Sequence, residues 1–230
     1  MLIIRLYPRK DLEKVWDFVL KNFEEYKSKT VKPLYISQLA GKNCISVILE
    51  VEHVNHIMEF LSEEIAGCEE ISKTKTISLV KPVFLPIPKK RPKNLNRYTV
   101  TLKLDPKRYK DIYKKLIDYR YPSKVFPTYI TYVLGRWDLM LSLNGRNHEE
   151  VFGFVQDRIS PMKGVREFSI IHIKRCRPIA SKEVWREFQK SLLYLPSWMT
   201  SEELKEKYLY DYRIYPTDEY GLTGAMVDEL

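Results

Sequence analysis

The turn Gly135-Arg136-Trp137-Asp138, between two apolar runs, is the residue group most able to bind a ligand. Gly135 lets the chain turn tightly. Arg136 could hold a carboxylate, and Asp138 could accept hydrogen bonds from an amino-acid ammonium group. Alternatively, Asp138 caps the turn and Trp137 packs at a protein interface. The sequence leaves both interpretations open.

Basic residues form a second group, because the charge of the chain is unevenly distributed. Residues 1–88 carry a net charge of 0, residues 89–180 a net charge of +13 and residues 181–230 a net charge of −4. Phosphate contacts release counterions, so a basic block favours a polyanionic partner. The alternatives are a heat-adapted surface or a solvated linker. The predicted nucleic-acid-binding residues are Lys89, Lys90, Arg91, Lys93, Arg97, Lys107 and Arg108.

Catalytic and metal-binding motifs are missing from the sequence. It contains no phosphate-binding Gly loop, no G-x-S-x-G and no H-E-x-x-H. Its four histidines are scattered without metal-ligand spacing, and His148 and His172 are interpreted as structural. We therefore expect no catalytic residue, no metal site, no cofactor and no enzymatic activity.

The cysteines and the apolar runs indicate a cytoplasmic protein. Cys44, Cys68 and Cys176 are an odd number without a C-x-x-C pair, as is typical of reduced thiols. Apolar runs fall far short of the roughly 20 residues that span a bilayer. The N-terminal run breaks too early for a signal peptide.

The elements that would position these groups occur twice. Lys32–Gly41 aligns without gaps with Phe126–Gly135, and the register continues over Ile45, Val47 and Leu49, which align with Leu139, Leu141 and Leu143. We call residues 1–82 copy one and residues 97–178 copy two. Each begins with a strand (Leu2–Leu6 or Tyr98–Leu104) and an amphipathic helix. A hairpin at a Gly turn, a second helix and a last strand (Ile71–Val80 or Val165–Ile173) follow.

This order predicts an α+β fold of two tandem ferredoxin-like (βαββαβ) domains with antiparallel sheets. Each sheet has helices on one face, so the open faces must cover each other or those of another chain. Residues 83–97 form a Pro-rich basic linker. Residues 179–230 form a helical and irregular tail with N-caps at Ser181 and Thr200. The tail is rich in tyrosine, at Tyr208, Tyr210, Tyr212, Tyr215 and Tyr220.

Copy two resembles the effector-binding domain of the Lrp/AsnC family of regulators. The likeness covers about 80 residues and rests on Gly135–Leu143, followed by His148–Val165, with a Gly, an aromatic residue and an Asp before a strand, a helix and a Gly-Val. Copy one is a looser version, because Cys44 stands where copy two has Asp138. The family's helix-turn-helix domain has no counterpart here.

The resemblance implies dimer building through the sheets and a small-ligand site at Gly135, Arg136, Trp137 and Asp138. We therefore expect a non-enzymatic, homodimeric regulator that acts through protein and polyanion contacts, tuned by an amino-acid-like effector. The alternative is a basic RNA- or ribosome-binding factor that regulates translation. A DNA-bound protein is a further potential partner of the basic region.

Overall fold

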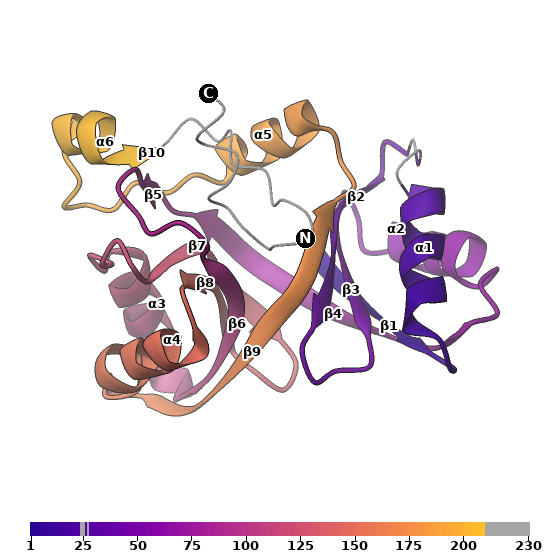
Figure 1. The fold of residues 1–230 in the computed structure, drawn as a ribbon, viewed down its shortest axis with the longest axis horizontal. Helices are drawn as coiled ribbons and strands as arrows, with labels where there is room; N and C mark the ends of the chain where they lie inside the picture. The colour runs from indigo at the N-terminus through magenta and orange to yellow at the C-terminus, as the bar shows by residue number, and fades with distance from the viewer. Residues whose placement is uncertain (24–25, 27, 210–230) are drawn as a thin grey trace.

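The computed structural model describes residues 1–23, 26 and 28–209, and eight of its strands close into one antiparallel barrel (Figure 1). Around the barrel the order is β1-β3-β2-β9-β6-β8-β7-β4. The strands of copy one are β1 (Leu2–Pro8), β2 (Val31–Leu39), β3 (Ile45–Val51) and β4 (Ile71–Phe84). Those of copy two are β6 (Asn96–Leu104), β7 (Phe126–Leu134), β8 (Leu139–Gly145) and β9 (Val165–Pro178). The predicted α+β, ferredoxin-like fold is confirmed.

The helices also follow the predicted order. Copy one contributes α1 (Leu12–Phe23) and α2 (His56–Phe60), and copy two contributes α3 (Tyr109–Ile117) and α4 (His148–Phe154). A short π-helical segment extends both second helices, at Leu61–Ile65 and Val155–Ile159. One pair of helices lies on each side of the barrel (Figure 1).

Two long strands join the copies. β4 pairs with β1 through Ile71–Ser78 and then with β7 through Ser78–Phe84. β9 pairs in the same way with β6 and then with β2. Both strands run beyond the predicted ends, Val80 and Ile173, and their last parts, from Ser78 of β4 and Ile173 of β9 onward, pair with the other copy. The open sheet faces therefore cover each other within one chain, while the domain boundaries stay a prediction.

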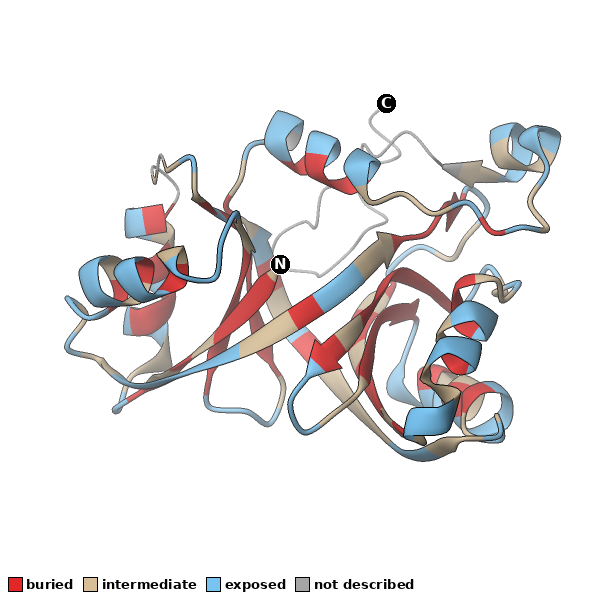
Figure 2. Cartoon of the chain, turned by 180° about the vertical axis from the view of Figure 1, so that it is seen from behind, coloured by how far each residue is buried: buried red, intermediate tan, exposed pale blue. Residues whose placement is uncertain are grey.

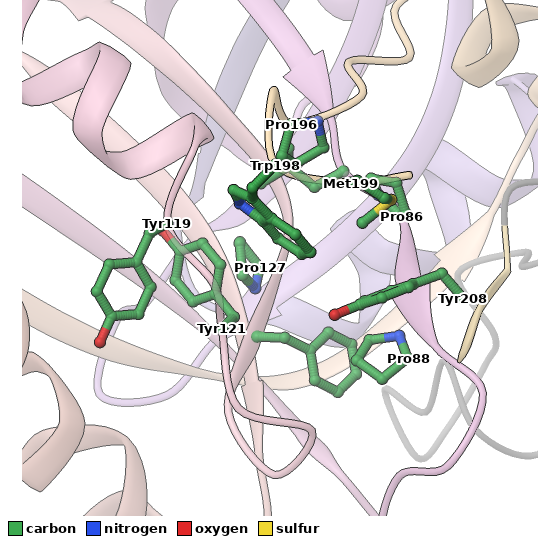
Figure 3. A pocket seen from close by; sticks show the side chains of 11 residues that line it. Pro86, Pro88, Tyr119, Tyr121, Pro127, Pro196, Trp198, Met199 and Tyr208 are labelled. Atoms are coloured by element: carbon green, nitrogen blue, oxygen red, sulfur yellow. The ribbon is translucent and has the colours of Figure 1, made fainter. Parts of the chain in front are cut away.

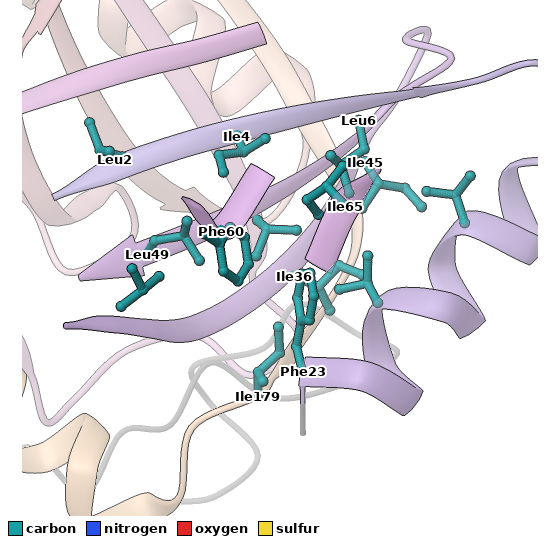
Figure 4. Close-up of a cluster of buried hydrophobic side chains, with 14 of the residues drawn as sticks. Leu2, Ile4, Leu6, Phe23, Ile36, Ile45, Leu49, Phe60, Ile65 and Ile179 are labelled. Carbon is teal, nitrogen blue, oxygen red and sulfur yellow. The ribbon is translucent and has the colours of Figure 1, made fainter. Parts of the chain in front are cut away.

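Alternating side chains along each strand serve two cores. Leu2, Ile4 and Leu6 of β1 point to the helices of copy one, where they pack with Phe23 and Phe60 (Figure 4). The intervening Ile3 belongs to a cluster inside the barrel. We call the interior of the barrel the lumen. Figure 2 shows the result, with buried residues on the strands and on one side of the helices that cover the two sheets. An equivalent cluster lies between the sheet of copy two and its helices.

The tail closes one end of the barrel. α5 (Lys182–Ser191) places Trp185 and Phe188 in the lumen cluster, against Tyr35 and Phe84. The predicted cap is confirmed, because the backbone N–H of Val184 donates to Ser181 Oγ at 3.3 Å.

A second tail helix, α6 (Ser201–Lys207), has the predicted Thr200 cap, with Glu203 N 3.1 Å from Thr200 Oγ1. After α6, the short strand β10 (Tyr208–Leu209) pairs with β5 (Ile87–Pro88) of the linker. Tyr210, Tyr212, Tyr215 and Tyr220 lie outside the described residues.

Candidate functional site

The β2–β3 and β7–β8 turns lie at the end of the barrel away from α5 (Figure 1). Residues of both turns line a hollow of about 520 Å³. Its lining comes from both copies, and we call it the basic mouth. The charged lining residues are Arg5, Lys42, Lys75 and Arg136, with Glu167 as the acidic one. Hydroxyl groups come from Thr76, Thr99, Thr101 and Ser169, and aromatic surface from Trp137 and Phe168.

The internal repeat brings a cation to each side of the rim. Gly41 and Gly135 occupy aligned positions, and both have positive φ angles, +69° and +143°, which Gly adopts without strain. The residue after each glycine is basic, Lys42 in copy one and Arg136 in copy two. The guanidinium carbon of Arg136 lies 5.5 Å from the ring centre of Trp137.

Two further cations of the mouth lie opposite each other on neighbouring strands. Arg5 of β1 is in direct register with Lys75 of β4, so both side chains leave the same face of the sheet. Like charges directly opposite each other destabilise a strand pair. Arg5 Nε is buried and has no hydrogen-bond partner in the described part of the chain.

A smaller chamber continues from the mouth into the lumen. It shares Arg5, Thr99 and Met140 with the mouth, and its volume of about 20 Å³ holds a single water molecule. Hydroxyl groups of Tyr35, Ser37, Ser46 and Tyr129 line it beside apolar side chains. The basic mouth is therefore a blind pocket with a polar floor.

The carboxylate of Asp138 is occupied by partners within the protein. It accepts hydrogen bonds from Leu104 N at 2.8 Å and Tyr109 Oη at 2.7 Å, and Lys103 Nζ lies 3.3 Å away. Burial alone would raise the pKa of Asp138, but these partners lower it overall. Of the predicted effector residues, Gly135, Arg136 and Trp137 line the mouth, whereas Asp138 stabilises the turn behind them.

The predicted nucleic-acid-binding residues do not form one surface. Arg97 is only 3% exposed, because its position on β6 faces the lumen, so it cannot contact a phosphate backbone. Lys89 Nζ donates to the carbonyl of Lys205, and Arg91 Nη1 donates to that of Pro88 at 2.9 Å. Lys90, Lys93 and Lys107 are exposed, and Arg108 pairs with Asp111 at 3.2 Å.

Two other hollows lack the charge imbalance of the basic mouth. One is a narrow apolar slot of about 20 Å³ lined by proline and aromatic side chains, among them Tyr121, Pro127, Trp198 and Tyr208 (Figure 3). The other, of about 630 Å³, lies beside α4. It combines Arg120, Lys124 and Arg158 with Glu149, Glu150 and Asp157, so its charges balance.

Other site types are missing from residues 1–23, 26 and 28–209. That part of the chain contains no group of three or more potential metal ligands. It also contains no helix that is both long and apolar enough to span a bilayer. Cys44, Cys68 and Cys176 form no disulfide.

Sequence reasoning missed three of the four cations in the mouth. The alignment of Gly41 with Gly135 was enough to find Lys42, because it places Lys42 opposite Arg136. Arg5 and Lys75 carry no local signal, since only the pairing of β1 with β4 brings them together.

Comparison with known proteins shows the fold but no family. The sequence matches no protein-family model and no curated protein. A siroheme decarboxylase has a similar solved structure, with a TM-score of 0.49 and 10% identity, over 83% of this chain and 78% of that one. A putative monooxygenase from Lactobacillus acidophilus also has a similar structure, with a TM-score of 0.48 and 9% identity, over 75% of this chain and 91% of that one. For a mutant chlorite dismutase from Candidatus Nitrospira defluvii, the TM-score is 0.46 and the identity 11%, over 82% of this chain and 94% of that one.

These comparisons correct the functional expectations from the sequence. The similar structures are mainly proteins named as monooxygenases, chlorite dismutases and a decarboxylase, and no Lrp/AsnC family match accompanies them. They contradict the expected non-enzymatic regulator and its RNA- or ribosome-binding alternative, as well as the expectation that the protein is not an enzyme. At such low identity they show the fold alone and assign no reaction to this chain.

Proposed function

We propose that the protein binds a small anionic molecule in the basic mouth of its barrel. The observation that carries this proposal is the excess of cations in a blind pocket of about 520 Å³, where Arg5, Lys42, Lys75 and Arg136 meet the single carboxylate of Glu167. A concave pocket of this size, with a few convergent polar groups, is typical of small-molecule sites.

The charges of the pocket support an anion as its ligand. None of the four cations has an ion-pair partner within the described ranges 1–23, 26 and 28–209. A buried donor without an acceptor, such as Arg5 Nε, costs about 1–3 kcal/mol. An anion between Arg5 and Lys75 would remove this cost and offset their repulsion.

The amino-acid effector implied by the Lrp/AsnC resemblance fits this pocket less well. With Asp138 bound within the protein, the described lining offers only Glu167 to an ammonium group. We therefore expect simple anions to bind more tightly than a zwitterionic amino acid of the same length.

Calorimetry with the full chain at low ionic strength tests the proposal. The probes are acetate, succinate, citrate, inorganic phosphate and glycine, measured against the wild type and the Arg5→Gln variant. The matched control is Lys115→Gln, which removes an exposed charge on α3 outside the pocket. We expect at least one anion to bind the wild type and the control, and to lose about tenfold or more in affinity in Arg5→Gln, which is about 1.4 kcal/mol. Equal affinities in all three proteins would disprove the proposal.

A further inference from the structure

We propose that the ligand of the basic mouth carries two anionic groups, one held between Arg5 and Lys75 and the other at the rim by Lys42 and Arg136. This inference rests on the proposed function, since it specifies the class of molecule bound at the same site. It follows from a comparison of the two copies, from the shape of the pocket and from its charge.

The comparison of the copies shows a carboxylate that copy one lacks. In copy two, Lys103 of β6 lies 3.3 Å from Asp138 of the hairpin turn. Cys44 stands at the position of Asp138 in copy one, since each residue directly precedes one of the aligned strands β3 and β8. The hairpin turn of copy one therefore offers no carboxylate to the cations of the mouth.

Two cations of the mouth, Arg5 and Lys42, lie near Cys44. Burial raises the pKa of the Cys44 thiol, while the nearby charges of Arg5 and Lys42 act to lower it. A thiol with a raised pKa is neutral at pH 7, so it does not neutralise either cation. The turn at Cys44 therefore offers no negative charge to Arg5, which leaves this guanidinium available to an anionic ligand.

The shape of the pocket places the second anionic group at the rim. Beyond Arg5 and Thr99, the inner chamber has room for one water molecule only. A ligand whose first anionic group reaches Arg5 must therefore extend outward, between the β2–β3 and β7–β8 turns. Lys42 and Arg136 lie on these two turns.

Charge balance also favours a ligand with two anionic groups. With four cations and one carboxylate in the lining, a monoanion leaves an excess of positive charge, and a dianion comes closer to neutrality. The planar guanidinium groups of Arg5 and Arg136 suit bidentate contacts with carboxylates. The lysines serve as point charges beside them. An elongated dicarboxylate is accordingly the ligand class that the geometry favours.

Succinate and butyrate provide a matched pair of probes, because they have the same number of carbon atoms and differ in one carboxylate. In calorimetry with the full chain at low ionic strength, we expect succinate to bind about tenfold or more tightly than butyrate, about 1.4 kcal/mol. Arg136→Gln should reduce succinate affinity to about the level of butyrate, and it should weaken butyrate much less than succinate. Arg5→Gln should weaken both probes, and Lys115→Gln neither.

A second variant, Cys44→Asp, tests the inner group without removing a cation. It should supply the carboxylate that copy two has, raise the melting temperature and weaken the binding of succinate and butyrate alike. Equal binding of succinate and butyrate, with loss of both in Arg5→Gln, would overturn the two-anion inference and leave the proposed function standing. Lack of binding by every anion tested would overturn both.

Discussion

Tyr35 and Tyr129 occupy aligned positions of the two copies, and their buried side chains interact inside the lumen, where both line the inner chamber. Burial raises the pKa of both side chains. The contact joins the sheets at the place where their open faces cover each other. The barrel is thus held by a polar pair as well as by apolar packing.

This pair predicts that the two hydroxyl groups are energetically coupled. Tyr35→Phe and Tyr129→Phe each leave a buried hydroxyl without its neighbour, so each should cost about 1–3 kcal/mol of unfolding free energy. The double variant should be less destabilised than the sum of the two, as urea unfolding in a double-mutant cycle would show. Additive losses would rule out a direct interaction between the hydroxyls.

The fold was predictable because its signals are local and occur twice. The stripe Leu12, Val15, Trp16, Val19 and Phe23 gave α1 with its observed start and end. The aligned hairpins at Gly41 and Gly135 gave the strand order of each copy. The extension of β4 to Phe84 and of β9 to Pro178 has no such signal, because these ends are strands only through pairing with the other copy.

The candidate site was predictable only where its residues are adjacent in the sequence. Gly135, Arg136 and Trp137 are adjacent in sequence, so a turn pattern was enough to single them out. Arg97, in contrast, looked like part of a basic run, although strand alternation turns its side chain into the lumen. Residues that meet across strands cannot be paired before the register is known.

Asp138 should make the stability of the protein depend on pH. Its pKa is lowered in the folded state, so it stabilises the fold at pH values above its unfolded pKa, about 3.9. This stabilisation is lost as the pH falls through the lowered folded pKa. We expect Asp138→Asn to cost about 1–3 kcal/mol at pH 7 and progressively less below pH 4 or so. Urea unfolding at a series of pH values measures this, and a constant difference would contradict the assignment.

Two glycines of copy two should respond oppositely to alanine. Gly164 has φ of +108°, and an added Cβ would lie 2.7 Å from Arg108 Cβ, so Gly164→Ala should destabilise the fold by roughly 1–3 kcal/mol. Gly153 lies within α4, and a Cβ added there would meet no atom of the described residues within 4 Å beyond those of its chain neighbours and of its own helix backbone. Gly153→Ala should therefore stabilise the fold by up to about 1 kcal/mol. Thermal melting of both variants provides the comparison. A stabilised Gly164→Ala would contradict the close approach of Arg108.

The three thiols should differ in reactivity. Cys44 and Cys176 are each only 1% exposed, whereas Cys68 is half-buried on the surface of copy one. Burial also raises the pKa of Cys44, which leaves little thiolate to react at pH 7. Native protein should therefore show one fast-reacting thiol with Ellman's reagent and three after denaturation. The fast phase should vanish in Cys68→Ser and persist in Cys44→Ser, and a second fast thiol in the native protein would show that the turn at Cys44 is open to solvent.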